Sequence, residues 1–576
     1  MKVKNILLLS LGLLCGTALF AQHNEEVTIE GTYRPKVNKV DKVMIQAETP
    51  EQSFSMPDTK VGVLEIEHRF PLQLERLSAL SYKDKDKQAE AVTKNFLMAG
   101  IGTRLSPVFL YKHNSNLTKN LGLGVGIRHF SSWLDIKDYA PSGFMNNAFE
   151  IGLSSSKFRD LQLNGGVYYL NDVYHYYGVK TTEWTGDESQ WEQMAPRQTY
   201  NTIGGRFAMT STSTKTREFL HNLSADYHYL FSALNSSEHL AEVHYGLSYA
   251  NNWWGDKSHP QKIGADVNFL FNSFGAQGYD MGMPTLITRQ TQTWLELKPY
   301  LEMRDEYFRL HLGFLVDGVG SVLEGASRVV IRPDLQGSLF VMNKKVEFYA
   351  GLKGGRHPYT YSELVKENPF VGTNPVLGLS NVKLGFDGGI RTNIMNTMDL
   401  HLGVRYRHTD HDLFFQQAPA MTITSASPYP YNSFTTLFDE TRLVSVLANI
   451  RWLPWDRLSV DAGFAYNHCT PTTEEHAWYR PTTEGNLKLG YQFNDALSLN
   501  ASFLYQGGRW AKPAAALSPA VKLADIYDLG LGADYVVMDD LTVFAKFNNL
   551  LNRKYDLYLD YPVTGIEFFA GVKMRF

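Results

Sequence analysis

The chain has no long apolar run after its first 21 residues. No eighteen consecutive apolar residues occur from residue 22 onward, which excludes a membrane-spanning helix in that part of the sequence. The sequence nevertheless contains 33 Phe, 32 Tyr, 10 Trp and 46 Gly residues. This composition is typical of a transmembrane β-barrel, because only half of each barrel strand faces lipid.

Cysteines and catalytic motifs are also scarce. The sequence has two cysteines, and Cys15 lies in a predicted leader, so a mature chain keeps only Cys469 and has no internal disulfide. A lone exported thiol is more often an incidental loop residue than a nucleophile. No Gly-x-Ser-x-Gly, His-Glu-x-x-His or paired-cysteine motif occurs. We therefore predict that the protein is not an enzyme and has no catalytic, cofactor-binding or metal-binding residues.

The charges form no basic domain or stripe. Lys and Arg number 55 against 59 Asp and Glu, a formal net charge of −4. A nucleic-acid partner is therefore not expected. The alternating glycines Gly122, Gly124 and Gly126 do not form a nucleotide-binding loop either, because no helix follows them and apolar residues alternate with them as in a barrel strand.

The N-terminus has the pattern of a secretory signal peptide. Lys2 and Lys4 form its basic start, residues 6–20 its apolar stretch, and Ala21 a small residue suited to cleavage. A lipidated N-terminus at Cys15 is the alternative, but bulky leucines precede it where a lipoprotein signal requires a small residue. We predict a signal peptide over residues 1–21.

Residues 22–93 differ from the rest of the chain. They are polar, contain four prolines and include the charge run 83–87, which alternates Lys and Asp. Such a run is typical of a solvated connector, here on the periplasmic side of the membrane. From residue 94 to 576 the pattern becomes strand, turn, strand with little interruption, and this part is predicted to be the barrel.

The last segment, residues 565–576, alternates apolar residues with polar ones and glycine and ends on Phe576. A strand of about nine to eleven residues crosses an outer membrane, with lipid-facing and lumen-facing positions alternating. The same alternation recurs in earlier segments, whose apolar members include Leu400, Leu402, Val404, Tyr406, Leu458, Val460, Ala462, Phe464, Leu497, Leu499, Phe503, Tyr527, Leu529 and Leu531.

Connection lengths supply an independent signal. Short polar turns are expected at 114–119, 158–160, 304–306, 342–345, 393–397, 454–457, 494–496 and 538–540. Longer connections are expected at 131–146, 171–198, 274–289, 354–380, 409–439, 468–484, 507–523 and 549–564. Bacterial barrels have short periplasmic turns and long extracellular loops. The count of strands is about 22, an even number that leaves both barrel ends in the periplasm.

The C-terminal region resembles the last hairpin of TonB-dependent receptors of the Bacteroidota type. The resemblance is carried by residues 547–555 (FNNLLNRKY), the Tyr561-Pro562 pair, and the terminal aromatic-aromatic-x-Gly strand that begins at Phe568. Residues 25–34 are similar to the alternating segment that precedes a receptor plug. The resemblance implies an all-β outer-membrane barrel, a C-terminal strand recognised by the outer-membrane assembly machinery, and a role in transport.

The sequence departs from these receptors in one large respect. Residues 22–93 are roughly half the length of a plug domain and lack its Gly-rich, hydrophobic strand pattern. No segment matches the TonB-contacting motif. Barrels of this size need a plugged lumen, so we expect a plugless, receptor-like barrel. Its lumen is closed by the plug-like remnant 22–93 with the long loops, or by a partner.

Three groups of residues are candidates for chemistry. His408, Asp410, His411 and Asp412 contain metal-ligand types, although a hydrated barrel rim is the favoured interpretation. A tyrosine-rich patch suits glycan stacking or, as favoured here, girdle and loop packing; it comprises Tyr168, Tyr169, Tyr174, Tyr176, Tyr177, Trp184 and Trp191. Inward-facing charges suit anion selection or salt bridges that anchor the N-terminal segment; they are Arg405, Arg407, Arg451, Lys488, Lys546, Lys573, Arg575, Asp461, Asp528, Asp534 and Glu567.

Two functions follow from this pattern. The first is transport or binding of a solute at the cell surface, with loops 171–198, 354–380 and 409–439 as the capture surface. The second is a non-transporting barrel subunit of an outer-membrane assembly, secretion or nutrient-capture complex, with a surface lipoprotein or another barrel as partner. Both place the protein in the Gram-negative outer membrane, in contact with its lipid.

Overall fold

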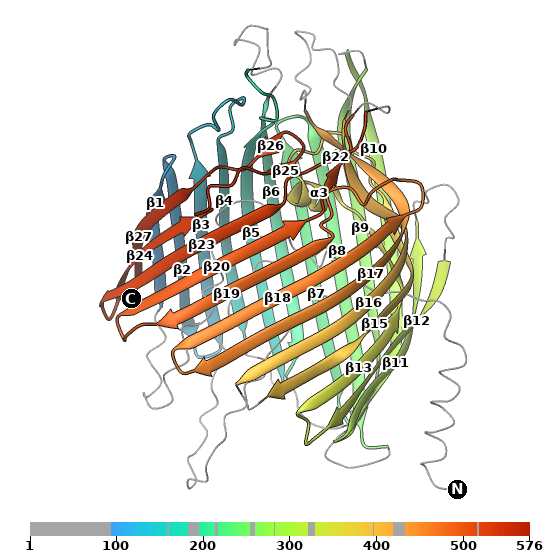
Figure 1. Ribbon diagram of the computed structural model, residues 1–576. Coiled ribbons are helices and arrows are strands. Elements are labelled where there is room, and N and C mark those ends of the chain that lie inside the picture. Colours follow the sequence, from blue (N-terminus) through green and yellow to red (C-terminus); the bar gives the residue numbers. More distant parts are fainter. Residues whose placement is uncertain are drawn as a thin grey trace.

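The computed structural model describes residues 94–576 except 157, 159, 183–194, 213–216, 254–259, 281–282, 321–328, 395–396, 419–431 and 515–517. The predicted signal peptide and the segment 22–93 therefore lie outside the described residues. The described chain winds into one antiparallel β-barrel with tilted strands (Figure 1). No helix in the described part is long and apolar enough to cross a membrane.

The barrel wall consists of consecutive antiparallel strands, each paired with the next. Their bounds are β1 Asn95–Gly102, β2 Ser106–Thr118, β3 Leu121–Ser132, β4 Phe144–Ser155, β5 Leu161–His175, β6 Arg197–Ser211, β7 Phe219–Ser232, β8 Ser236–Asn251, β9 Gln261–Asp280, β10 Met283–Arg304, β11 Phe308–Val319, β12 Val329–Val341, β13 Val346–Lys353, β14 Gly355–Pro358, β15 Leu379–Ile394, β16 Met398–Gln417, β17 Phe434–Trp455, β18 Leu458–Pro471, β19 Thr483–Gln492, β20 Leu497–Gly507, β23 Ile526–Met538, β24 Leu541–Asn548 and β27 Glu567–Arg575.

The smaller elements all lie in the long connections. The helix α3 (Tyr361–Glu367) follows β14, and two short hairpins, β21 (Trp510–Ala511) with β22 (Val521–Lys522) and β25 (Asp556–Tyr558) with β26 (Tyr561–Pro562), lie in the last two connections. Figure 1 shows α3 and these hairpins at the end of the barrel that carries the long connections.

The barrel has 22 wall strands, as the sequence predicts. The main sheet contains 23 strands, but β13 and β14 pair end to end with the same neighbour, β15, and so form one interrupted strand. The wall closes where β1 pairs with β27, from Phe96 opposite Arg575 to Gly102 opposite Phe569. The amide of Asn95 donates to the carbonyl of Phe576 at 2.8 Å, so the two ends of the barrel meet at the closing seam.

A pair of glycines permits close packing at this seam. Gly100 and Gly571 lie directly opposite each other, and a Cβ on Gly571 would clash with the carbonyl oxygen of Ala99. Gly571, in the predicted terminal strand, therefore allows β1 and β27 to approach closely where the wall closes.

The predicted alternation is confirmed in the wall. In β16, Leu402 and Val404 are 44% and 48% exposed on the outer face, whereas the intervening His401 is 4% exposed on the inner face. Apolar outer positions recur on every side of the barrel, among them Phe149, Ile203, Phe314, Phe348, Val446, Phe464 and Leu531. An outward apolar band over a polar interior is the surface that a lipid bilayer requires of a barrel.

The two barrel ends differ in their connections. At the end where β1 begins and β27 finishes, the wall strands are joined by short turns, such as those at 342–345 and 456–457. The opposite end carries the long connections 359–378, 418–433, 472–482, 508–525 and 549–566. One predicted long loop is wrong: residues 274–289 belong mostly to β9 and β10, whose pairing continues to Asp280 opposite Met283. The two strands continue there as one hairpin.

Candidate functional site

The longest connection that the structure describes throughout folds inward over the barrel mouth. We call residues 359–378, between β14 and β15, the lid loop. Its helix α3 begins with a capping box, in which the Thr360 hydroxyl accepts the amide of Glu363 and the Glu363 carboxylate accepts the amide of Thr360 at 3.1 Å. The box satisfies two donors that a short helix otherwise leaves unpaired. The Thr-x-x-Glu spacing was visible in the sequence and could have located this helix.

Three tyrosine hydroxyls hold the backbone of the lid loop. Tyr176 donates to the carbonyl of Val371 at 2.7 Å, Tyr200 to Pro369 at 3.1 Å, and Tyr558 to Glu367 at 2.9 Å. These tyrosines come from the loop after β5, from β6 and from β25, so three distant parts of the chain converge on one loop. Buried carbonyls need partners, and these hydroxyls supply them.

Acidic and polar side chains of the wall also bind the backbone of the lid loop. Glu238 of β8 is fully buried and accepts the amides of Tyr361 at 2.6 Å and Ser362 at 2.8 Å. Ser236 donates to the carbonyl of Thr373 at 2.6 Å, and Thr436 to that of Val376 at 2.8 Å. The carboxylate is favourably placed at the first turn of α3, where free amides accumulate.

An apolar core fills the space between the lid loop and the wall. One buried cluster includes Tyr200 on β6, Phe274 on β9, Leu364 in α3, Phe434 on β17 and Tyr561 on β26. Because β6 and β17 lie on nearly opposite walls, this cluster spans the barrel mouth. The aromatic rings pack tightly, with Phe370 and Tyr561 stacked at 3.8 Å between centroids. The long connections thus close their end of the barrel with a hydrophobic core of their own.

Charged groups secure the remaining loops to this core. Arg480 donates two hydrogen bonds to Asp412, at 2.6 and 2.7 Å, and a third to the carbonyl of Leu413 at 2.8 Å. Arg509 is 3% exposed and donates to the carbonyls of Leu557, Ala524 and Asp556. A guanidinium has five donors in a fixed fork, so one arginine holds several loop strands at once.

The protonation states of the loop groups follow from these contacts. Burial lowers the pKa of Arg509 to about 10, although nearby Tyr555 and Asp556 oppose the shift. Burial also acts to raise the pKa of Glu363, but the neighbouring His357 and the bonds with Thr360 outweigh it and hold that pKa below its ordinary value. Glu363 is therefore ionised at neutral pH, as the capping box requires.

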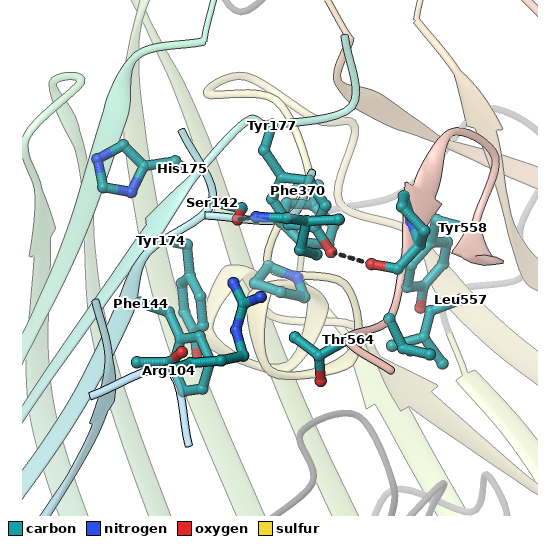
Figure 2. Close-up of a pocket in the computed structure, with 15 residues that line it drawn as sticks. Arg104, Ser142, Phe144, Tyr174, His175, Tyr177, Phe370, Leu557, Tyr558 and Thr564 are labelled. Carbon is teal, nitrogen blue, oxygen red and sulfur yellow. Dashed lines mark hydrogen bonds between the residues drawn. The ribbon is translucent and has the colours of Figure 1, made fainter. Parts of the chain in front are cut away.

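A cavity of about 50 Å³ remains between the closing loops and the wall. Figure 2 shows residues of the lid loop, such as Phe370, facing Tyr174 and Phe144 of the wall, with the Arg104 side chain extending between them. The hydroxyl of Tyr177 donates to the carbonyl of Pro562 at 2.9 Å along one side. The sequence did not reveal this cavity, because its lining comes from five separate segments.

The candidate metal ligands are divided by the structure. His408 and Asp410 lie close to Glu440, and these three groups could approach one ion. Lys383 already forms ion pairs with Asp410 at 2.5 Å and Glu440 at 3.4 Å, so an ammonium neutralises the carboxylates. Asp412 is turned away after a β-bulge and binds Arg480 instead. The arrangement supports the favoured interpretation of a rim of ion pairs.

The predicted aromatic patch is not a single surface. Tyr169 faces outward, Tyr168 faces the lumen beside Arg206 and Asp226, and Tyr176 belongs to the apolar core of the mouth. Trp184 and Trp191 lie outside the described residues. The structure therefore shows girdle and loop packing for the described tyrosines, the favoured alternative.

The inward charges pair largely with one another, across adjacent strands or, for Lys573 and Asp534, across the intervening strand β24. Arg405 bonds to Asp387 at 2.7 Å, Arg451 to Asp461 at 2.8 Å, and Lys573 to Asp534 at 2.5 Å. The described ion pairs include both signs, and they neutralise this part of the lumen wall. A ring of one sign, which anion selection needs, is not formed by these residues.

Fold and loop arrangement together define a class: a 22-strand antiparallel barrel of the outer-membrane type, closed at one end by its own connections. Neither the models of known protein families nor the curated proteins contain a match to this sequence. Solved structures do match. The ferric-catecholate import receptor Fiu from Escherichia coli K12 has a TM-score of 0.61 at 10% identity, over 85% of this chain and 82% of its own.

Two further receptors resemble the chain to the same degree. The pyoverdine outer-membrane receptor FpvA from Pseudomonas aeruginosa has a TM-score of 0.62 at 12% identity, covering 85% of this chain and 79% of FpvA. The siderophore receptor PiuA from Acinetobacter baumannii has a TM-score of 0.59 at 12% identity, covering 84% and 82%. At this identity the likeness concerns the fold: it confirms the predicted receptor-like barrel. None of the described residues forms a globular plug.

Proposed function

We propose that the protein is a receptor-like outer-membrane barrel that binds or admits a solute at the cell surface, with the lid loop as its gate. The observation that carries this proposal is the position of the lid loop, which is seated in the mouth and held by hydrogen bonds from strands around it. The barrel fold shared with import receptors supports transport, although the fold by itself hosts other roles.

A gate must open, and the contacts of the lid loop suggest how. Most of its bonds to the wall come from single side chains, among them those of Tyr200, Ser236, Glu238 and Thr436. Its backbone pairs with the wall at one isolated bridge, Val371 opposite Phe434, and not along a continuous β-sheet ladder. Loops held by separate side-chain contacts open at lower free energy than paired strands do. We infer that the lid loop moves while the wall stays closed.

Conductance tests this function. The full-length protein is reconstituted in planar bilayers beside a variant in which residues 361–376 are replaced by a short Gly-Ser linker. A two-residue Gly-Ser insertion in the opposite turn, 342–345, is the control for handling and folding. We expect rare openings in the wild type and the control, and a permanently conducting variant. A shortened variant that stays closed would show that the lid loop is not the gate.

The alternative function is a non-transporting barrel subunit. One observation favours it: the closure is an apolar core containing Phe434, Tyr361 and Tyr561, all fully buried, and such a core resists opening. Under this alternative the wild type never conducts at any voltage or pH. Purification from native outer membranes in mild detergent would then recover a stoichiometric partner, such as another barrel or a surface lipoprotein, whereas a transporter would elute alone.

The proposal includes two assignments for the chain ends. We propose that residues 22–93 are a plug-like remnant at the periplasmic side or inside the lumen. We also propose that the C-terminal strand, which ends on Phe576, is the signal that the outer-membrane assembly machinery recognises.

Replacing Phe576 with Ser should lower the amount of folded barrel in the outer membrane, measured by heat-modifiable migration of membrane fractions.

A further inference from the structure

The cavity between the closing loops and the wall has an unusual polar group. Arg104, in the turn between β1 and β2, points into the ring of lining residues (Figure 2). Its Nη2 donates to the carbonyl of Leu134, while its Nε, which is buried, and its Nη1 have no hydrogen-bond partner among the described residues. Arg104 is partly buried, and a cation with a buried, unused donor calls for an explanation, because such donors are normally satisfied.

A second orphaned group lies in the same cavity. Ser132 is 2% exposed, and its hydroxyl has no partner among the described residues. The other polar lining groups are occupied: Tyr174 accepts from Asn146 at 2.8 Å, and the Thr564 hydroxyl donates to Glu567 at 2.8 Å. The unused groups, a guanidinium and a hydroxyl, can both donate hydrogen bonds, so they fit an acceptor.

The carboxylates near Arg104 favour its charged form but do not take up its hydrogen-bond donors. Burial lowers its pKa, and the carboxylates of Glu567 and Asp135 oppose that shift. No hydrogen bond or ion pair joins either carboxylate to Arg104 in the described part of the chain: Asp135 accepts the amide of Ser142 at 2.7 Å, and Glu567 accepts the Thr564 hydroxyl. The guanidinium is therefore charged and still has donors for a ligand.

The rest of the lining limits the ligand in size and character. Phe144, Phe370, Leu557 and Val563 contribute apolar walls. A volume of about 50 Å³ corresponds to roughly three to five waters, at about 10–15 Å³ each. A ligand of similar size has a few heavy atoms. A carboxylate is a planar acceptor that matches the guanidinium of Arg104, and a short apolar tail matches the apolar walls. A short aliphatic carboxylate has both.

We propose that this cavity binds a short-chain aliphatic carboxylate, of the size of acetate to butyrate, with its oxygens on Arg104 and its tail against Phe370 and Leu557. The ligand would contact both the wall and the lid loop. This site goes beyond the proposed gating function and does not depend on it, because binding is measured on the closed protein.

The test is a titration of the full-length protein in detergent micelles with propionate, followed by saturation-transfer NMR and by calorimetry. We expect saturable binding that Arg104→Gln weakens at least about tenfold, since one charge-assisted contact is lost. Propionamide, which has the same shape without the charge, should bind as weakly to the wild type as propionate does to that variant. Arg553→Gln is the matched control, because Arg553 is an exposed loop arginine outside the lining.

Each outcome decides the matter. A propionate signal that does not saturate with the wild-type protein would mean that the cavity holds only water. Equal affinity of Arg104→Gln and the wild type for propionate would show that Arg104 does not bind the ligand. Heat-modifiable migration checks that Arg104→Gln folds. If it does not fold, Arg104→Lys keeps the charge but not the fork, and unchanged affinity in that variant would also overturn the assignment. Conductance of the lid-shortened barrel is unaffected by either result, so the two proposals fail separately.

Discussion

At the scale of single residues, Arg480 and Asp412 form an ion pair with two hydrogen bonds in the closing loops. In Arg480→Ala, Asp412 keeps the hydrogen bond from the Thr441 hydroxyl at 2.7 Å but loses its guanidinium partner. Because a partly buried carboxylate then loses its counter-ion, we expect the free energy of unfolding to fall by about 2–3 kcal/mol. Urea unfolding of the barrel in lipid vesicles, followed by tryptophan fluorescence, measures this change.

The control for that prediction is another arginine pair of the same barrel. Arg451 bonds to Asp461 at 2.8 Å, but both side chains are about half exposed. Exposed pairs contribute little, so Arg451→Ala should cost under about 1 kcal/mol. Equal losses in the two variants would contradict the view that burial makes the Arg480 pair important.

Glu363 makes the lid loop sensitive to acid. Its pKa is held below the ordinary value of 4.5 in the folded protein, chiefly by His357 and Thr360 against the effect of burial. A carboxyl group whose pKa is lower in the folded than in the unfolded protein stabilises the fold at pH values above its pKa in the unfolded protein. This contribution is lost as the pH falls through its pKa in the folded protein. We expect hydrogen exchange in residues 359–378, corrected for intrinsic rates, to accelerate below about pH 4.5 in the wild type.

The matched variant for the acid effect is Glu363→Gln. The amide cannot ionise, so exchange in the lid loop should be faster than in the wild type at pH 7 and should change little between pH 7 and pH 4. An acid response that persists in Glu363→Gln would assign the effect to another carboxylate, of which Glu238, bonded to the first turn of α3, is the nearest candidate.

At the scale of elements, the three lid tyrosines act together. Replacing Tyr176, Tyr200 and Tyr558 with Phe removes three hydrogen bonds to the lid backbone while keeping the rings in the core. At a net value of about 1 kcal/mol for each bond, local opening of the lid loop should become at least about a hundredfold more frequent. Trypsin cleavage after Lys366, an exposed residue of α3, reports that opening.

Tyr169→Phe is the control for the lid tyrosines. Its hydroxyl also makes a good bond, to Asn201 at 2.8 Å, but on the outer face of the barrel wall. Cleavage after Lys366 should be unchanged in this variant. Equal cleavage rates in the triple variant and the wild type would show that the apolar core alone holds the lid loop.

The elements differ in how far the sequence predicts them. Strands such as β16 and β27 are visible in the sequence because a wall strand meets lipid on one face and the lumen on the other, which imposes a period of two. The lid loop has no such period. Its position depends on Tyr200, Glu238 and Tyr558, which are distant in sequence, and nothing local in the chain reveals that they converge.

Two other segments show the limits of local sequence. Residues 274–289 were predicted to be a loop, but they continue the antiparallel ladder of β9 and β10. His408 and Asp412 were grouped as candidate ligands because they are close in sequence. The β-bulge between Thr409 and Asp412 places them on different sides of the strand. A single extra residue therefore separates two side chains that spacing alone would group, in keeping with the favoured interpretation of a rim.

At the scale of the whole molecule, the chain has two regions that can close the lumen. The lid loop and its neighbours close the end that carries the long connections. The segment 22–93 precedes β1 in the sequence, and β1 begins at the opposite end of the barrel. We predict that this segment contributes to the seal, because a 22-strand barrel is wide enough to need a filled lumen.

Deletion of residues 30–88 tests that prediction in cells. If the segment is part of the seal, the deletion should raise sensitivity to antibiotics and detergents that the outer membrane excludes, at equal amounts of folded barrel. Replacement of residues 361–376 in the same background should raise it further, because two barriers in series are then both open. Unchanged permeability after the first deletion, followed by a rise only after the second, would assign the whole barrier to the lid loop and leave residues 22–93 another role.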